Sequence, residues 1–511
     1  MTSTVLKNAL SLGKRVRLYL AKNHFFNDTL KYVPASLLPA VFSIVAVSLY
    51  TRIFSSIEYG VFSLVIAFTG PVTTVLTDWL AHPTGRFLSE YVKRNREDEF
   101  KRIISLMMVL VAVSVSFVSL IAILTLSYFF SKTIRPSTYL SIPLLIILQS
   151  FSGISMAIIS AKRDVKLYRS ITIASSGLSV VASLILIEIF GKNIELLFWG
   201  QIVSTIFILP YALNASQLSF SRLILPTEFT PRIWHTVRRV WRYGAPMAMW
   251  FVAAGVLNAE DRYVIQFFRN YSEVGIYSIN YGFIFGLSGL MSVPVTTSIG
   301  PILYKQWANR NFDSMEIVIG KMTEVYLIIA SFMLGCIILI GKPFVYLVMG
   351  EEFHSGYIIL VPVLLGRIVW GASIIGHKGI ELKENTSLMV KYLFYSAVLN
   401  LVLNIIFVYF YGYVAAAYTT FVSYFFYAYL IWNQSKSHIY WRLYFKHIAS
   451  YIVIMLVSCT LTYLLTKLFT YQNFIEEIVI DSFIFILIYS ALLWVIKRQR
   501  IIYISRMGDI L

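Results

Sequence analysis

The sequence predicts an all-α membrane protein of about fourteen transmembrane helices, and three observations support this fold class. Of the 511 residues, 58% are hydrophobic and only 13% are charged, whereas about a quarter of the residues of a soluble domain are charged. Long apolar runs recur along the whole chain, and basic residues gather between them. Aromatic residues make up 16% of the chain, which is typical of lipid-facing and interfacial positions.

Fourteen apolar runs have the length of about 20 residues that a helix needs to cross the hydrocarbon core. The runs are continuous and do not alternate between polar and apolar residues, which disfavours the strands of a β-barrel. The least distinct runs are 195–214 and the closely spaced pair within 389–432. The predicted spans are 33–52, 61–81, 103–129, 138–161, 171–190, 195–214, 244–267, 275–300, 322–341, 357–377, 389–411, 413–432, 447–467 and 477–496.

The basic residues predict the orientation of the spans, because cytoplasmic loops carry an excess of Lys and Arg. With the N-terminus in the cytoplasm, most of the 43 Lys and Arg residues fall on the cytoplasmic side. An odd number of helices would destroy this pattern. We therefore expect a multi-pass protein of the cytoplasmic (inner) membrane with both termini in the cytoplasm and no cleavable signal peptide.

The chain divides into two lobes and two additional helices. Six crossings return the chain to the same face, so the lobes are expected to be parallel pseudo-repeats. Pro-Val-Thr-Thr occurs at 71–74 and again at 294–297, in the second span of each lobe. The predicted divisions are a basic cytoplasmic segment at 1–32, an N-lobe at 33–214, a cytoplasmic linker at 215–243, a C-lobe at 244–432, and two further spans with a basic tail at 433–511.

Several functional classes are excluded by composition. The net charge of +18 is spread over many short loops, whereas nucleic-acid-binding proteins concentrate basic residues in one patch. Cys336 and Cys459 both lie in apolar runs, so neither a disulfide framework nor a metal cluster is expected. No loop is long enough for a soluble catalytic domain. The sequence thus predicts no catalytic residue, no metal and no cofactor.

Four segments resemble those of a known transporter family. They are Tyr50–Phe62 with its Glu-Tyr-Gly, Asp261-Arg262 followed by Val274–Ser278, Pro301–Tyr304, and Asn400 with Asn404 followed by Tyr411–Ala417. The chain resembles polysaccharide exporters of the multidrug/oligosaccharidyl-lipid/polysaccharide superfamily, which includes the O-antigen (Wzx-type) flippases. It departs from their pattern at Ala415, where a second glycine is common.

The resemblance implies a flippase that moves a lipid-linked oligosaccharide across the membrane by alternating access. The sugar and its diphosphate would cross through a central polar cavity while the lipid tail stays in the bilayer. A proton or sodium ion would drive transport, and other polysaccharide-assembly membrane proteins are potential partners.

Arginines within the spans are the first candidates for substrate binding, because an intramembrane charge costs about 2.5–3.5 kcal/mol. Arg262 and Arg367 lie inside apolar runs, and a guanidinium can hold diphosphate oxygens bidentately. Alternatively, both arginines form structural ion pairs, with Glu260 and Glu188 as potential partners. Arg52 ends the first span, where it either lines the cavity or extends to the interface.

Acidic and neutral polar residues supply further candidates. Asp261 is predicted to line the cavity, but it points about 100° away from Arg262 on a helix, so these two side chains are not expected to pair. Asn400 and Asn404 share one face of the eleventh span and could hydrogen-bond across helices.

The second span carries three polar residues on one face. Asp78, His82 and Arg86 are four residues apart, so they share a helix face. Asp78 and His82, with Glu260 elsewhere, could bind the coupling ion, and Asp78 and Arg86 could also line the cavity. Alternatively, Arg86 anchors the helix at the interface and His82 caps its end.

Two prolines inside predicted spans are candidates for helix bending. Pro71 and Pro294 could let the second and eighth spans bend during gating, although proline is common in membrane helices.

A related drug-cation antiporter (MATE-type) would have twelve spans and a carboxylate-rich pocket. A peptidoglycan lipid-precursor flippase is compatible with the same residues.

Overall fold

The computed structural model describes residues 24–130, 136–162, 164–218, 230–383 and 385–498. In these ranges the protein is helical, and they contain no β-strand. The elements are α2 (His24–Ile53), α3 (Ser56–Lys93), α4 (Glu97–Phe130), α5 (Pro136–Ala161), α6 (Val165–Phe190), α7 (Leu196–Ser216), α8 (Pro231–Phe268), α9 (Tyr271–Ala308), α10 (Phe312–Val348), the 3₁₀-helix η2 (Glu351–Ile359), α11 (Leu360–Gly376), α12 (Lys378–Leu382), α13 (Thr386–Tyr411), α14 (Tyr413–Ser435), α15 (Phe445–Thr466) and α16 (Phe474–Arg498).

The predicted all-α membrane fold is confirmed, and each predicted span except the tenth corresponds to one long helix. Twelve helices in the described ranges are long and apolar enough to cross a membrane. The two remaining helices are α2, with a shorter apolar stretch at Leu37–Ile53, and α8. Polar residues follow one another in α8, from Asn258 through Glu260 and Asp261 to Arg262.

Local sequence signals explain several helix boundaries. Ser55 caps α3, since its side chain accepts from the Glu58 backbone N–H at 3.3 Å and its own N–H donates to the Glu58 carboxylate at 2.9 Å. This reciprocal pair is a capping box. Between α13 and α14 the chain turns at Gly412, where φ is 61°. A side chain is strained at that φ, and a Cβ atom there would lie 2.5 Å from the Glu273 carboxylate.

The tenth predicted span is not a single α-helix. The run 357–377 begins inside η2 and continues as α11, so the chain enters this span through a tighter helix. Gly356 of η2 explains the close packing there, because a Cβ atom would lie 2.0 Å from the Asn280 amide nitrogen. The Asn280 amide also donates to the Phe353 carbonyl at 3.2 Å. Thus η2 is fastened to α9.

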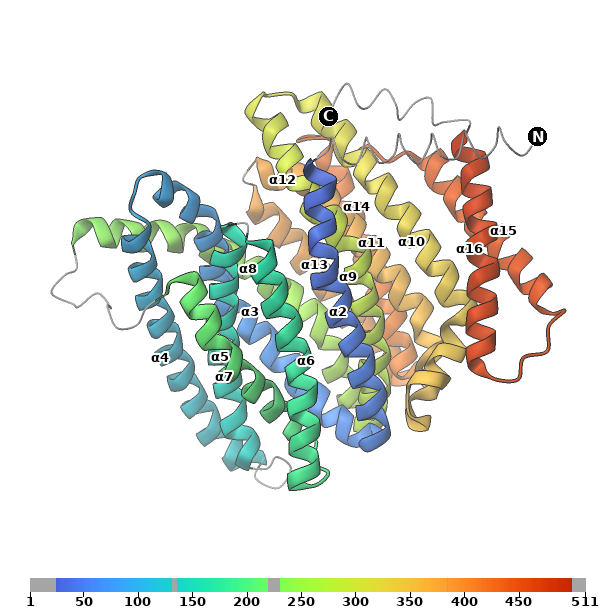
Figure 1. The fold of residues 1–511 in the computed structure, drawn as a ribbon, viewed down its shortest axis with the longest axis horizontal. Helices are drawn as coiled ribbons and strands as arrows, with labels where there is room; N and C mark the ends of the chain where they lie inside the picture. The colour runs from blue at the N-terminus through green and yellow to red at the C-terminus, as the bar shows by residue number, and fades with distance from the viewer. Residues whose placement is uncertain (1–23, 131–135, 163, 219–229, 384, 499–511) are drawn as a thin grey trace.

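The helix α3 connects the two halves of the chain. It packs against α5 in the first half and against both α8 and α9 in the second. Figure 1 shows α4 to α7 on one side and α10, α15 and α16 on the other, with α2 between them. The helices α15 and α16 pack against α10.

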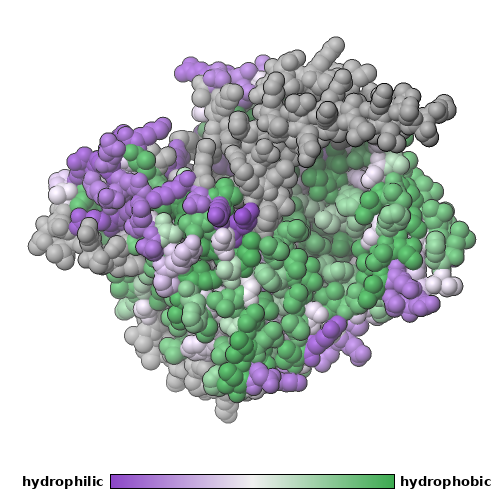
Figure 2. All heavy atoms as spheres, in the orientation of Figure 1, coloured by the Kyte–Doolittle hydropathy of each residue, from purple (hydrophilic) through white to green (hydrophobic). Residues whose placement is uncertain are grey.

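The apolar side chains form one large core and several small ones. The large core runs through α8 to α14, and smaller clusters lie among α2 to α8 and between α10, α15 and α16. Many large apolar side chains also remain exposed on the outside of the helices. Figure 2 shows them as a hydrophobic band between hydrophilic patches at the upper and lower edges. The chain is therefore a multi-pass membrane protein.

Candidate functional site

The carboxylate of Asp261 lies at the centre of the second half of the chain. It is fully buried and accepts hydrogen bonds from Tyr277 of α9 at 2.5 Å and Thr420 of α14 at 2.8 Å. Asn404 and Asn400 of α13 donate to its other oxygen at 2.7 and 3.0 Å. These donors come from three helices, so Asp261 fastens α8 to α9, α13 and α14.

Two further hydroxyl groups extend this Asp261 network. Thr419 donates to the side-chain oxygen of Asn404, and Ser423 donates to that of Asn400 at 3.3 Å. Carboxylate, amide and hydroxyl oxygens are ligands of hard cations, but both amide groups here donate to the carboxylate. The described residues contain no group of three or more His, Cys, Asp or Glu side chains that could hold a metal ion.

Arg262 points away from Asp261, as the helical geometry predicts. Its Nε donates to Ser278 Oγ at 3.0 Å, and its Nη1 donates to the Asn258 carbonyl at 2.8 Å. The guanidinium lies over the ring of Tyr281, 5.3 Å from its centroid. The arginine is half-buried, so part of its guanidinium remains accessible.

Arg367 of α11 reaches the same place from the opposite side. Its Nε donates to Ser288 Oγ at 3.0 Å, and its Nη1 lies 3.5 Å from Asn258 Oδ1. It lies over the exposed ring of Phe285, 4.4 Å from the centroid. Both arginines thus contact Asn258, one through its carbonyl and the other through its side chain.

Within the described part of the chain, neither arginine forms an ion pair with a carboxylate. The predicted pairs with Glu260 and Glu188 are not formed. Glu260 is half-buried with one carboxylate oxygen lacking a hydrogen-bond partner among the described residues, and Glu188 is exposed on α6. The guanidinium groups of Arg262 and Arg367 therefore have only neutral hydrogen-bond partners among the described residues. An anion bound between them would balance their charge.

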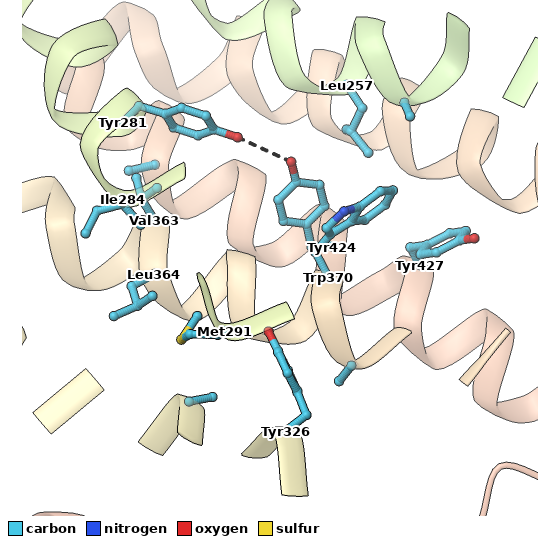
Figure 3. Close-up of a cluster of buried hydrophobic side chains, with 14 of the residues drawn as sticks. Leu257, Tyr281, Ile284, Met291, Tyr326, Val363, Leu364, Trp370, Tyr424 and Tyr427 are labelled. Carbon is cyan, nitrogen blue, oxygen red and sulfur yellow. Dashed lines mark hydrogen bonds between the residues drawn. The ribbon is translucent and has the colours of Figure 1, made fainter. Parts of the chain in front are cut away.

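Buried aromatic residues also contact Asn258. The Tyr424 hydroxyl donates to Asn258 Oδ1 at 2.7 Å, and Tyr281 donates to the same oxygen at 3.2 Å. Figure 3 shows these two tyrosines pointing toward each other, with Trp370 beside Tyr424. The two hydroxyl oxygens are 3.4 Å apart. The side chain and carbonyl oxygens of Asn258 thus accept from four side chains, and its amide donates to the Ala254 carbonyl at 2.6 Å. The sequence prediction missed this residue, although an asparagine four residues before Arg262 was a visible signal.

The three polar residues of the second span lie on α3. The His82 ring stacks on Phe251 of α8 with centroids 4.8 Å apart, and the Arg86 guanidinium lies 4.4 Å from the Tyr243 centroid. Asp78 is half-buried and makes no hydrogen bond or ion pair with another described residue. His82 and Arg86 thus face α8, and they do not belong to the hydrogen-bond network around Asp261.

Arg52 lies at another place, where α2 meets the end of α10. Its Nη2 donates to the Leu347 carbonyl at 2.8 Å, and the residue is exposed. Next to it, Thr51 Oγ1 accepts from the Gly350 N–H at 3.0 Å. The structure does not bring Arg52 into contact with Arg262 or Arg367.

The junction is closed by residues of the segments that carry the family resemblance, together with Glu352, which the sequence did not single out. The Glu352 carboxylate accepts from both the backbone N–H and the hydroxyl of Ser56 at 2.7 Å. The hydroxyl oxygens of Ser56 and Ser272 are 2.8 Å apart. A Cβ atom at Gly275 would lie 2.0 Å from the Ser56 carbonyl, so α3 and α9 touch through their backbones. The Glu-Tyr-Gly and Val-Gly segments of the sequence meet here.

The two prolines predicted to bend helices lie within continuous helices. Pro71 is inside α3, and its ring packs against Gly255 of α8, where a Cβ atom would be 3.0 Å away. Pro294 falls within α9, and its side chain lies outside the described residues. Their role in gating stays a prediction.

The structure is a bundle of long apolar helices with arginines, a carboxylate and amides in its interior. The chain belongs to the polysaccharide biosynthesis protein family, whose family model matches residues 26–307. It is 21% identical over 289 residues to the probable low-salt glycan biosynthesis flippase Agl15 of Haloferax volcanii. That match covers 55% of this chain and 57% of Agl15, so the chain matches little more than half of that relative.

Solved structures share the fold. The lipid II flippase MurJ in an inward closed conformation superposes with a TM-score of 0.72 at 16% identity, covering 93% of this chain and all of MurJ. The Vibrio cholerae MATE transporter VcmN, in a mutant form, gives a TM-score of 0.58 at 11% identity, covering 81% and 95% of the two chains. These likenesses show a shared fold, and the family model confirms the predicted polysaccharide family.

Proposed function

We propose that this protein moves a lipid-linked oligosaccharide, carried on a polyprenyl diphosphate, across the cytoplasmic membrane for surface polysaccharide synthesis. Membership of the polysaccharide biosynthesis family supports this function. Agl15 is named a glycan biosynthesis flippase and MurJ a lipid II flippase. Transport of this kind requires no covalent chemistry, so the proposed protein is a transporter and not an enzyme.

The observation that carries the proposal is the pair of arginines at Asn258. Arg262 and Arg367 present guanidinium groups whose described partners are all neutral. A diphosphate offers several anionic oxygens, and two guanidinium groups can bind them with charge-assisted hydrogen bonds. The exposed ring of Phe285 beside Arg367 offers an apolar face to a sugar or an isoprenoid unit.

The proposed cycle is alternating access between two lobes, 33–214 and 244–432, with the segment 215–243 as their linker. The distribution of basic residues supports cytoplasmic termini. In this arrangement the contact between Ser56 and Glu352 lies at the outer end of the lobes. We propose that this contact opens when the substrate leaves the site.

A proton or a sodium ion is the proposed coupling ion. Asp78 and Glu260 support this because both are half-buried acids in the membrane, and Glu260 has a buried oxygen without a hydrogen-bond partner among the described residues. His82, stacked on Phe251, is the third candidate. Other membrane proteins of polysaccharide assembly are the proposed partners in the cell.

The proposal is tested by deleting the gene and measuring surface polysaccharide and accumulated lipid-linked oligosaccharide. We expect the glycan to fall and its lipid-linked precursor to accumulate on the cytoplasmic side. Normal glycan with raised sensitivity to cationic drugs would instead indicate a MATE-type antiporter. Arrested peptidoglycan synthesis with normal surface glycan would indicate a peptidoglycan lipid-precursor flippase.

Replacing the two arginines tests the site itself. The double variant Arg262→Gln with Arg367→Gln keeps hydrogen-bonding capacity but removes both charges, so export should fall at least about 100-fold, since a hydrogen bond to a charged group contributes about 1.5–3 kcal/mol. Lys391→Gln is the matched control, because this exposed lysine lies over the Tyr395 ring on α13. Export that survives the double variant at the level of the control would remove the arginines from the substrate path.

A further inference from the structure

A cavity lies between the last helices and the end of α10. Its volume is about 930 Å³, within the range of ligand pockets in proteins. The walls come from α10, from η2 and α11, and from α15, α16 and the connection between them. It is separate from Arg262, Arg367 and Asp261, since none of these three residues lines it.

The cavity is polar at one end and apolar at the other. Four charged residues line it: Lys342 in the last two turns of α10, Lys467 directly after α15, and Glu477 and Asp481 within the first eight residues of α16. Its apolar walls lie one or two turns deeper in the same helices and in α11, and consist of Ile337, Ile338, Leu339, Val361 and Cys459. This gradient follows the direction from the membrane surface to the hydrocarbon core, so the cavity fits an amphipathic molecule.

The charges at the polar end are present but not paired with one another. The Lys342 ammonium lies 5.5 Å from the Tyr357 ring centroid, and that of Lys467 lies 4.7 Å from the Tyr463 centroid. Among the described residues, neither lysine forms an ion pair with a carboxylate. Both lysines are exposed, so their donors are available to a ligand.

The carboxylates at the same end are arranged similarly. Asp481 is 6% exposed and accepts a hydrogen bond from the Tyr471 hydroxyl at 2.5 Å. Tyr471 lies between α15 and α16, and burial, together with the bond to Asp481, raises the pKa of Tyr471 to about 12. The phenol therefore stays protonated and donates to Asp481, which leaves the second oxygen of that carboxylate and the half-buried Glu477 for a cationic group.

Access to the cavity is from the lipid. Large apolar side chains around it are exposed, with Ile338 at 44%, Ile358 at 41% and Phe469 at 49%. On the inner side, α16 is fastened to α10 by Phe485, which packs against Gly335, and by Tyr489, whose hydroxyl lies 2.8 Å from Ser331 Oγ. The helix α16 is thus fixed to α10 on the inner side of the cavity.

We propose that this cavity binds one zwitterionic glycerophospholipid of the surrounding leaflet. The lysines hold its phosphate, and Glu477 and Asp481 hold its ammonium group. One acyl chain lies along the apolar wall of α10 and α11. The site does not rest on the transport function; only the name of the leaflet, the outer one, rests on the proposed orientation.

The test uses the purified full-length protein, stripped of lipid in detergent. Native mass spectrometry is used to titrate dioleoyl phosphatidylethanolamine, phosphatidylcholine and phosphatidylglycerol onto it. We expect phosphatidylethanolamine to bind about tenfold more tightly than phosphatidylglycerol, since only the former adds charge-assisted hydrogen bonds to the carboxylates. Phosphatidylcholine should lie between them, because its quaternary ammonium cannot donate.

Three variants distinguish binding of the phosphate by the lysines from binding of the ammonium group by the carboxylates. Lys342→Ala with Lys467→Ala should weaken all three lipids about tenfold, whereas Glu477→Gln should remove only the preference for phosphatidylethanolamine. The control Lys391→Ala removes a lysine with the same kind of ring contact from α13 and should change nothing. If the double variant does not fold, the single variant Lys467→Ala is measured instead and should also weaken the binding of all three lipids.

Equal binding of the three lipids to the wild type would overturn the proposal and indicate unselective annular lipid. Unchanged binding in both lysine variants would also overturn it. Because these measurements need no transport substrate, their failure leaves the proposed flippase function standing, and loss of that function leaves this site standing.

Discussion

The two halves of the bundle are held together by different means. In the second half, a single buried carboxylate, Asp261, accepts hydrogen bonds from three neighbouring helices. The first half has no such centre among its described residues, because its two buried charged side chains, Lys101 and Glu195, lie at the start of α4 and just before α7. There the helices meet through small residues and neutral hydrogen bonds along their length, and an ion pair such as Glu97–Lys162, at 3.0 Å, lies at the helix ends.

Three contacts illustrate the first half. A Cβ atom at Gly200 of α7 would lie 2.0 Å from Ser183 Oγ of α6, Ser204 donates to the Ser175 carbonyl at 2.9 Å, and Thr77 donates to Ser150 at 3.0 Å. Lipid provides no hydrophobic force between helices, so close packing of small residues and interhelical hydrogen bonds are the two available means. The second half adds a buried charge, so substitutions at its centre should lower the stability more than substitutions in the first half.

The largest effect is expected at the charged centre. Asp261→Ala removes the acceptor of four buried donors, and each unsatisfied group costs about 1–3 kcal/mol. The free energy of unfolding should fall by about 3 kcal/mol or more, measured by steric trapping in bicelles. Asp261→Asn keeps the volume and one acceptor, so its effect should be smaller. A variant as stable as the wild type would show that the network contributes nothing to packing.

An intermediate effect is expected where backbones touch in the first half. Gly200→Ala places a methyl group against the backbone N and Cα of Ser183, each 2.7 Å away, and such overpacking costs about 1–3 kcal/mol. The melting temperature in detergent should fall accordingly. Gly282→Ala on α9 is the matched control, since nothing lies within 4 Å of its Cβ position; the comparison fails if both variants melt together.

The smallest effect is expected for a neutral hydrogen bond. Thr77→Val keeps the shape of the side chain but removes the bond to Ser150, and interhelical bonds of this kind contribute about 0.6 kcal/mol. Thr77→Ser, which keeps the hydroxyl, should be closer to the wild type in the same unfolding measurement. A loss as large as that of Asp261→Ala would erase the distinction between the halves.

The candidate site could be predicted only in part. Arg262, Arg367 and Asp261 stood out because a charge inside an apolar run is costly. Their partners Asn258 and Ser288 are neutral residues common in membrane helices, and the only signal was that Asn258 stands four residues before Arg262. Charge alone left open whether Arg367 lines the cavity or pairs with an acid, and α11 places it against Asn258 and Phe285.

The sequence by itself determined the membrane class, the fourteen helices and several of their ends. These depend on short-range properties: the length of an apolar run, a capping box at Ser55, a left-handed turn at Gly412. Only the tertiary structure decided that Asp261 meets Asn400 and Thr420, and that Arg262 and Arg367 share Asn258. Asp261 is 139 and 159 positions from Asn400 and Thr420, and Arg367 is 109 positions from Asn258. Which helix faces touch over such separations depends on packing that no local pattern encodes.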